Sequence, residues 1–305
     1  MPAPHSAPGS RPKPRLVSAL LSLGVLLSAA CEQPTPTPPP SAPIVAPVAA
    51  PTATEKPAKW PLKVPDASTI PEGKLGDAVR RGEALLTHTR EELPQNVGNG
   101  LRCTSCHLNG GTVANAGPWV GIVGVFPEYR SRNDRVNALP DRVNDCFERS
   151  LNGKALDPAS DDMTAIVAYM TWLSKDVPTG TPIEGRGFKR IAEPPTPDPA
   201  AGEALYAEKC SVCHGAEGQG LSGPDGATLY PALWGDASFN IGAGMARLDT
   251  AAAFVRWNMP FGQGGTLSDQ QAYDVAAYFT TQPRPDFARK AEDWPKGDKP
   301  RDARY

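Results

Sequence analysis

The segments CTSCH, residues 103–107, and CSVCH, residues 210–214, decide how this chain folds. Each has the pattern C-x-x-C-H, which is the attachment signature of c-type haem. The two thiols bond covalently to the haem vinyl groups, and the histidine supplies one axial ligand of the iron. Two such motifs argue against structural disulfides and against a zinc site. We therefore expect two covalently bound haem c groups, which attach at Cys103, Cys106, Cys210 and Cys213 and are ligated by His107 and His214.

The surroundings of the two motifs repeat as well. A helix-like stretch precedes each motif, over residues 75–92 and 198–210, and a glycine-rich loop follows it. Residues 160–175 and 268–282 then have apolar side chains at helical spacing, and each segment opens on a serine suited to be an N-cap. This order resembles the mono-haem cytochrome c fold. We predict an all-α protein with two tandem cytochrome c-like domains of class I.

Changes in composition suggest the domain boundaries. Residues 177–199 are rich in proline and glycine and have little periodicity, which is typical of a linker. We expect a first domain over residues 66–180, an interdomain linker over 181–198 and a second domain over 199–283. The polar, proline-rich tail over 284–305 is expected to wrap the surface or to stay loose.

The chain opens on a segment that resembles an export signal. Three basic residues precede a 15-residue apolar run, residues 16–30, that ends at Cys31. The run is shorter than the roughly 18 apolar residues of a membrane-spanning helix, and its small terminal residues are typical of a signal peptide. We expect residues 1–30 to be a lipoprotein-type signal peptide and Cys31 to carry a lipid anchor. The alternative is that Cys31 lies in a discarded signal.

Residues 31–65 are expected to form a disordered spacer. They are rich in Pro, Ala and Thr, and residues 1–65 hold 16 of the 35 prolines of the chain. Such a composition buries too little apolar surface to fold. We expect a periplasmic protein anchored as a lipoprotein, with the outer membrane favoured because Glu32 replaces the aspartate associated with inner-membrane retention.

The net charge of the chain argues against polyanionic partners. The formal net charge is -2 and the isoelectric point is about 6.1. This balance argues against nucleic acid or an anionic membrane surface as an electrostatically selected partner.

The second axial ligands of the two irons decide the chemistry. For the second haem the candidates are Met245 and Met259. Met259 lies in WNMPFGQGG, just before the terminal helix, where a proline-stiffened loop suits a thioether ligand, whereas Met245 is expected to pack. We favour Met259; its alternative role is that of a core methionine.

For the first haem no methionine lies between His107 and Met163, but Cys146 does. It is the one cysteine without an assigned role, and we expect it to ligate this iron; the alternative is a buried inert thiol. A thiolate ligand lowers the reduction potential, which does not suit a simple carrier. The chain has only four histidines, so bis-histidine ligation of both haems is excluded, and His88 is expected to be a surface or core residue.

The segment over residues 128–149 carries five arginines and no lysine. Arginine suits planar, bidentate recognition of oxyanions. For Arg130, Arg135 and Arg149 we favour ion pairs with neighbouring acids. Arg142 lies four residues before Cys146, on the same side of a helix or loop, whereas Arg132 can reach Cys146 only through the fold.

Several stretches of the chain together carry a resemblance to a known family: CTSCHLNGGT, GPWVG, FPEYRSR, DRVNDCFERSLNG, MTAIVAYMTWLSK, IEGRG, the second C-x-x-C-H and NMPFG. They cover roughly residues 70–285. With them the chain resembles the thiosulfate dehydrogenase family of di-haem cytochromes.

The resemblance implies an enzyme that couples two thiosulfates to tetrathionate; some members run the reaction backwards. It implies a catalytic haem in the first domain, ligated by His107 and Cys146, with Arg132 and Arg142 as thiosulfate-binding residues. The second, electron-transfer haem has His214 and Met259 as its ligands. Some relatives exchange a lysine with this methionine; here Asn258 stands at that position. A small cytochrome c or a high-potential iron–sulfur protein is the expected soluble electron acceptor.

Two other functions agree with the haem motifs. An exported di-haem electron carrier needs neither Cys146 nor the arginines. A di-haem peroxidase needs an open haem and a histidine or glutamate placed for peroxide cleavage, and the four histidines leave almost no candidate.

Overall fold

The computed structural model describes residues 58–224 and 226–305, and these belong to one compact unit. The predicted signal peptide, the acylation site Cys31 and most of the proline-rich spacer lie outside the described residues. Among the helices that the structure describes, none is both long and apolar enough to cross a membrane.

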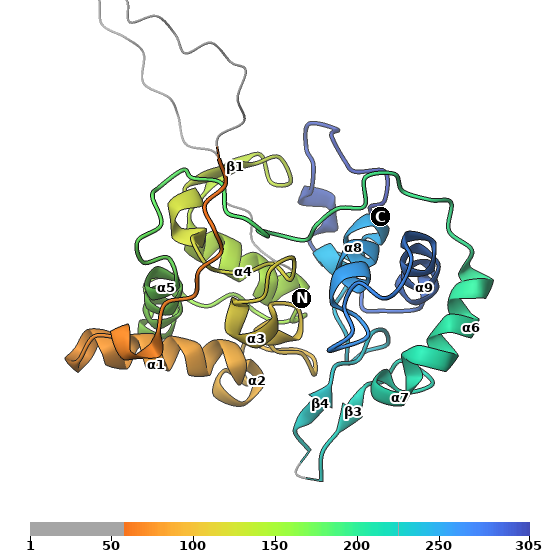
Figure 1. Ribbon diagram of the computed structural model, residues 1–305, viewed down its shortest axis with the longest axis horizontal. Helices are drawn as coiled ribbons and strands as arrows, with labels where there is room; N and C mark the ends of the chain where they lie inside the picture. Colours follow the sequence, from red (N-terminus) through yellow and green to blue (C-terminus); the bar gives the residue numbers. More distant parts are fainter. Residues whose placement is uncertain (1–57, 225) are drawn as a thin grey trace, which may run out of the picture. The chain divides into compact units, whose positions relative to one another are not determined.

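The first domain consists mainly of short helices (Figure 1). Its helices are α1 (Gly73–Thr87), α2 (Thr89–Glu92), α3 (Leu108–Gly111), α4 (Leu139–Arg149) and α5 (Asp161–Leu173). Turns of 3₁₀ helix lie at Ala67–Thr69, Cys103–Ser105 and Ile122–Val125. Strands β1 (Glu128–Arg130) and β2 (Arg135–Asn137) form an antiparallel hairpin with Glu128 opposite Asn137.

The second domain repeats this plan. Its helices are α6 (Pro199–Lys209), α7 (Ser211–His214), α8 (Leu248–Asn258) and α9 (Asp269–Thr281), with 3₁₀ turns at Gly244–Ala246 and Lys290–Glu292. Strands β3 (Leu221–Ser222) and β4 (Thr228–Tyr230) form the second antiparallel hairpin. In the described residues, sheet is confined to these hairpins and one isolated bridge.

The first and last helices of each domain cross at a glycine. Helix α1 packs on α5, and α6 packs on α9. A Cβ atom on Gly82 would lie 2.0 Å from the carbonyl oxygen of Ala165, and one on Gly202 would lie 2.0 Å from that of Asp274. Only glycine permits so close an approach. The same contact at equivalent places agrees with the predicted repeat.

The predicted N-caps of the terminal helices are present. The hydroxyl of Ser160 accepts a hydrogen bond from the backbone N–H of Met163, and that of Ser268 accepts one from Gln271. Both caps satisfy N–H groups that a helix start leaves free.

The C-terminal tail packs against the second domain. The backbone N–H of Ile241 donates to the carbonyl of Pro285, at 3.0 Å, and Phe287 and Trp294 are buried. Of the two expectations for this segment, the structure shows the packed arrangement. The tail also contacts the first domain, because the N–H of Trp294 donates to the carbonyl of Arg132 at 2.7 Å.

Candidate functional site

A cavity of about 300 Å³ lies beside the second C-x-x-C-H motif. Cys210, Cys213 and His214 line it, together with Met259 and mostly apolar side chains. The Nδ1 atom of His214 lies 2.8 Å from the carbonyl oxygen of Pro231, and since a carbonyl only accepts, Nδ1 carries the proton. Burial lowers the pKa of His214, although the Pro231 contact opposes this. The neutral ring therefore keeps its Nε2 lone pair for a metal.

The first C-x-x-C-H motif lines a second cavity, of about 310 Å³. Here Nδ1 of His107 donates to the carbonyl of Gly117 at 2.5 Å, which again leaves Nε2 as the free lone pair. The indole of Trp119 stacks on the imidazole with 4.9 Å between the ring centroids. Both cavities thus offer two thiols, a histidine of fixed tautomer and apolar walls, and these residues fit a covalently attached haem c.

Helix α4 brings Cys146 into the first cavity, where it faces His107. The Nη1 atom of Arg142, one turn earlier, donates to Sγ of Cys146 at 2.9 Å. Burial raises the pKa of this thiol, but Arg142 and the contact with His107 outweigh burial and bring the pKa to about 7. By contrast, burial raises the pKa of Cys103 and of Cys106 to about 12. Cys146 is therefore the thiol most suited to be an anionic ligand.

Both candidate methionines, Met245 and Met259, line the second cavity. Met259 directly follows α8 and lines the second cavity. The Asn258 side chain beside it is buried and donates to the carbonyls of Phe254, at 3.0 Å, and Asn115, at 3.2 Å. Met245 lines the same cavity and is buried. Ligation of the second iron by Met259 stays a prediction.

The structure separates the two arginines predicted to bind thiosulfate. Arg142 lines the first cavity beside Cys146, but Arg132 does not line it. Its Nε atom donates to Asp293 in the tail at 2.8 Å, and its Nη2 atom donates to the carbonyl of Gly242 at 2.7 Å. Binding of thiosulfate by Arg132 stays a prediction that this placement does not support.

Besides Arg142, the first cavity is lined by Arg102, which also borders the second cavity, and by Arg130 and Arg186. Arg130 makes the expected ion pair, 3.2 Å from Glu128, and its guanidinium also lies at the cavity wall. Arg186, from the segment between the two domains, lies 3.6 Å from the other oxygen of Glu128. The sequence did not predict Arg186 as a site residue, because it stands between two glycines, far from the arginine-rich segment. Its place in IEGRG is the one signal that the sequence offers.

The first cavity is basic and has no carboxylate in its described lining. Among its described lining residues no Asp or Glu occurs, and His107 is the single histidine. A general acid or base for peroxide cleavage is therefore absent from these lining residues. Four guanidinium groups, of Arg102, Arg130, Arg142 and Arg186, and one thiol of low pKa suit a small anion instead.

The two cavities are neighbours. Leu101, Arg102 and Cys106 line both of them. The domains also touch directly: the side chain of Asn99 donates to the carbonyl of Ser238 at 3.0 Å. This arrangement places the two haem-binding sites on either side of one short segment.

Comparison with known proteins agrees with this arrangement. Residues 94–179 match the family described as SoxA/TsdA, cytochrome c domain, and residues 199–283 match the family Cytochrome c. The predicted fold of two tandem cytochrome c domains and the predicted pair of haem c groups are thereby confirmed.

Named relatives cover most of the chain. A thiosulfate dehydrogenase of Psychrobacter arcticus is 56% identical over 243 residues, which are 80% of this chain and 74% of that protein. One of Allochromatium vinosum is 47% identical over 236 residues, 76% of this chain and 87% of that protein.

A solved structure has the same fold. The thiosulfate dehydrogenase TsdBA of Marichromatium purpuratum superposes with a TM-score of 0.72 at 40% identity and covers 76% of this chain, which spans 50% of that longer chain. With its two haem sites and these relatives, the chain belongs to the thiosulfate dehydrogenase family of di-haem c-type cytochromes.

Proposed function

We propose that this protein is a thiosulfate dehydrogenase, which joins two thiosulfate ions at their terminal sulfur atoms into tetrathionate. The reaction forms one S–S bond, releases two electrons and moves no proton. The observation that carries the proposal is the first cavity, where Cys146 and Arg142 lie beside Arg130 and Arg186. A carrier without a substrate of its own needs none of these four residues. The same site serves the reverse reaction, reduction of tetrathionate.

The arginines lower the main barrier to this reaction, which is the repulsion between the two substrate anions. Two dianions repel each other, and fixed guanidinium groups in a cavity of low polarity lower that repulsion without a proton. Holding both ions together also converts their encounter into a step within one complex. We assign Arg142 to the reacting end of the substrate, because it contacts Cys146, and Arg130 and Arg186 to capture of the incoming anion.

Cys146 and His107 would hold the first iron, and His214 and Met259 would hold the second. The haem c groups, when bound, supply two one-electron acceptors that pass electrons on to an external acceptor. Arg142 lowers the pKa of the Cys146 thiol and so favours the thiolate form that a metal ligand needs.

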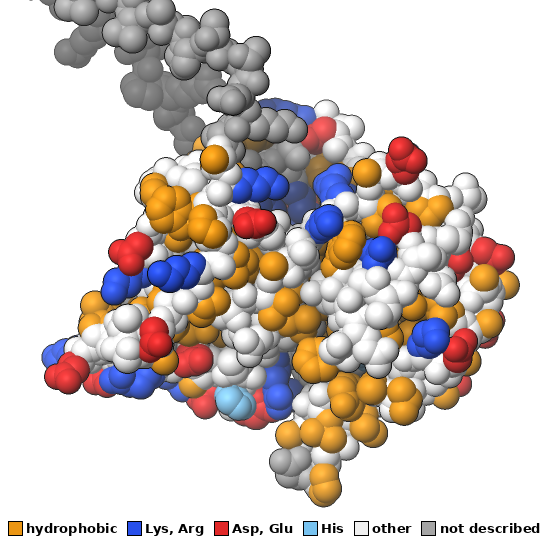
Figure 2. All heavy atoms as spheres, viewed as in Figure 1, with side chains coloured by type: hydrophobic (Ala, Val, Ile, Leu, Met, Phe, Trp, Pro, Cys, Tyr) orange, Lys and Arg blue, Asp and Glu red, His pale blue; other side chains and the backbone are white. Residues whose placement is uncertain are grey.

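The external acceptor is proposed to be a small redox protein, such as a cytochrome c or a high-potential iron–sulfur protein, that docks at the second domain. Support comes from apolar side chains around the second cavity: Val212, Leu229 and Phe261 are 79%, 59% and 70% exposed. Figure 2 shows hydrophobic side chains gathered over the β3–β4 hairpin. An exposed apolar patch of this kind marks an interaction site.

The acceptor proposal can be tested with two acceptors. Phe261→Glu is expected to slow reduction of a small cytochrome c by thiosulfate but not reduction of ferricyanide. Leu75→Glu is the matched control, because Leu75 is 60% exposed but lies on α1 of the first domain. Equal loss with both acceptors would place the defect in catalysis rather than docking.

We also propose that the protein is exported to the periplasm, acylated at Cys31 and anchored in the outer membrane. This proposal rests on the N-terminal sequence. Fractionation of cells that produce the native chain and Cys31→Ser tests it. The native protein is expected with the outer membrane and the variant in a soluble fraction; soluble native protein would contradict the anchor.

The test of the function itself is Cys146→Met. Purified holoprotein is assayed for tetrathionate formation from thiosulfate with ferricyanide as acceptor. The variant is expected to keep two haems per chain, because Cys146 is not an attachment cysteine, and to lose turnover. Full turnover in the variant would remove Cys146 from the mechanism, and no turnover in the native protein would refute the function.

A further inference from the structure

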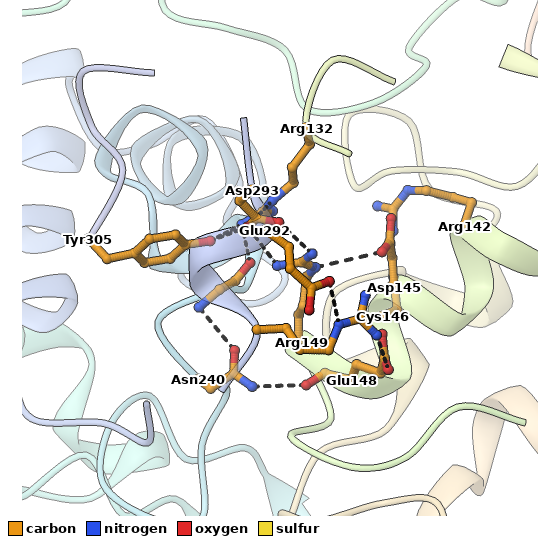
Figure 3. A network of polar contacts seen from close by, with 12 residues as sticks. Arg132, Arg142, Asp145, Cys146, Glu148, Arg149, Asn240, Glu292, Asp293 and Tyr305 are labelled. Atoms are coloured by element: carbon orange, nitrogen blue, oxygen red, sulfur yellow. Dashed lines mark hydrogen bonds and ion pairs between the residues drawn. The ribbon is translucent and has the colours of Figure 1, made fainter. Parts of the chain in front are cut away.

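The carboxylate of Asp293, in the C-terminal tail, is shared by two arginines of the first domain (Figure 3). Its two oxygens each accept a hydrogen bond at 2.8 Å from Arg149, through Nη1 and Nη2. One oxygen also accepts from Nε of Arg132 at 2.8 Å. The Asp293 side chain is 1% exposed, so this is a buried charge cluster rather than a surface ion pair.

Other tail residues complete the cluster. The hydroxyl of Tyr305 donates to Asp293 and also accepts from Nη2 of Arg132. The Arg132 guanidinium lies over the ring of Trp294, 4.7 Å from its centroid, and that of Arg149 lies over Phe287 at 4.1 Å. Each arginine therefore contacts the tail through both a charge and an aromatic face.

Arg149 lies on the same helix as the candidate ligand. It is the last residue of α4, three positions after Cys146 and seven after Arg142. Residues at this spacing lie along one side of a helix. The contact of Arg149 with Asp293 therefore also restrains the rotation and position of α4, and with them the side chains of Cys146 and Arg142.

The carboxylate of Asp293 balances the charges of Arg132 and Arg149. Two guanidinium groups face one carboxylate, so its loss leaves the buried Arg149 and the part-buried Arg132 to repel each other. Asp145, 3.6 Å from Nε of Arg149, is then the acid that still pairs with Arg149. Separation of the two arginines would move the end of α4 away from the β1–β2 hairpin segment that carries Arg132. A bidentate arginine contact is also directional, so it defines orientation and not merely proximity.

We propose that Asp293 is a positioning residue for the first haem site: from the tail, it holds α4 so that Cys146 stays opposite His107 and Arg142 stays on the sulfur. This inference rests on the proposed function for its kinetic consequence but not for its spectroscopic one. It assigns the tail a role in catalysis, although no tail residue lines the first cavity.

The test compares Asp293→Asn with Asp293→Glu in the di-haem protein. The matched control is Asp302→Asn, which removes another tail carboxylate. Asp302 pairs with Arg247 at 2.9 Å and accepts from the N–H of Asp249, and neither residue lies on α4. Each oxidised protein is examined by EPR, and its kcat and KM for thiosulfate are measured with ferricyanide.

Asp293→Asn is expected to shift or split the low-spin signal of the thiolate-ligated haem and to lower kcat by about tenfold or more. The signal of the second haem should stay unchanged. Asp293→Glu should recover part of both effects, and Asp302→Asn should leave the first haem signal unchanged. A normal first haem signal and kcat in Asp293→Asn would overturn the proposal.

A milder variant covers the case in which Asp293→Asn does not fold. Tyr305→Phe removes one donor to Asp293 and should broaden the first haem signal while the protein stays folded; an unchanged signal then counts against the proposal. If the native protein does not oxidise thiosulfate but Asp293→Asn still shifts the first haem signal, the proposed function fails and the positioning role stands.

Discussion

Arg142 donates a hydrogen bond from Nη1 to Sγ of Cys146, 2.9 Å away and one turn further along α4. The contact links a proposed oxyanion-binding group to a candidate iron ligand in one helix. If Arg142 binds the substrate anion as proposed, the charge on the sulfur and the position of that anion depend on the same side chain.

Arg142→Lys is expected to lower kcat/KM for thiosulfate by about 10- to 100-fold, since a hydrogen bond to a charged group contributes about 1.5–3 kcal/mol. Lysine keeps the charge but has neither the length nor the planar fork of arginine. Steady-state kinetics with ferricyanide measure the change. The Arg135→Ala variant is the control, because Arg135 is exposed on the β1–β2 hairpin; an equal loss there would point to a general effect of charge.

Arg186 offers a second test of the first cavity. Its side chain is 41% exposed, lines the cavity and lies 3.6 Å from Glu128, which does not line it. Arg186→Ala should raise KM for thiosulfate several-fold and lower kcat little, because a partly exposed charge helps to capture the anion more than it helps the reaction. The KM should also become less sensitive to salt than that of the native protein. A fall in kcat alone would assign Arg186 to the chemical step instead.

Much of this site could be predicted because its chemistry is local in sequence. The C-x-x-C-H motifs bring cysteines and histidine together within five residues, and Arg142 precedes Cys146 by one helical turn. Helical spacing likewise identified α5 and α9, with their serine caps.

The remaining parts depend on contacts between distant residues. Arg132 binds Asp293, 161 positions further along the chain, and a charged residue in a polar tail gives no sign that it becomes buried. The sequence therefore suggested an anion-binding role for Arg132, although the fold turns its guanidinium toward the tail. Arg186 enters the cavity only because the interdomain segment passes beside β1.

The Asp293 cluster predicts how stability depends on pH. Burial raises the pKa of the Asp293 carboxyl, but Arg149, Tyr305 and Arg132 outweigh burial, so the pKa lies below its ordinary value. A depressed folded-state pKa means that this stabilisation is present above the unfolded-state value, about 3.9, and is lost as the pH falls through the folded-state value.

The native protein is therefore expected to exceed Asp293→Asn in free energy of unfolding by about 3–5 kcal/mol near neutral pH. This gap should stay level down to a pH of about 5 and shrink below about 4. Urea unfolding of both holoproteins across this range measures it. A gap that widens on acidification would show that Asp293 is protonated in the folded protein.

The two methionines of the second cavity can be told apart by paired substitutions. Met259 follows the end of α8 and is held by the backbone bond from its N–H to Val255, at 3.0 Å, whereas Met245 is buried in a 3₁₀ turn. Leucine preserves the volume of either side chain but has no sulfur. Because a methionine ligand raises the potential of a haem, Met259→Leu should lower the potential of the second haem and remove its sulfur-to-iron absorption band. Met245→Leu should change neither, and the reverse outcome would make Met245 the ligand.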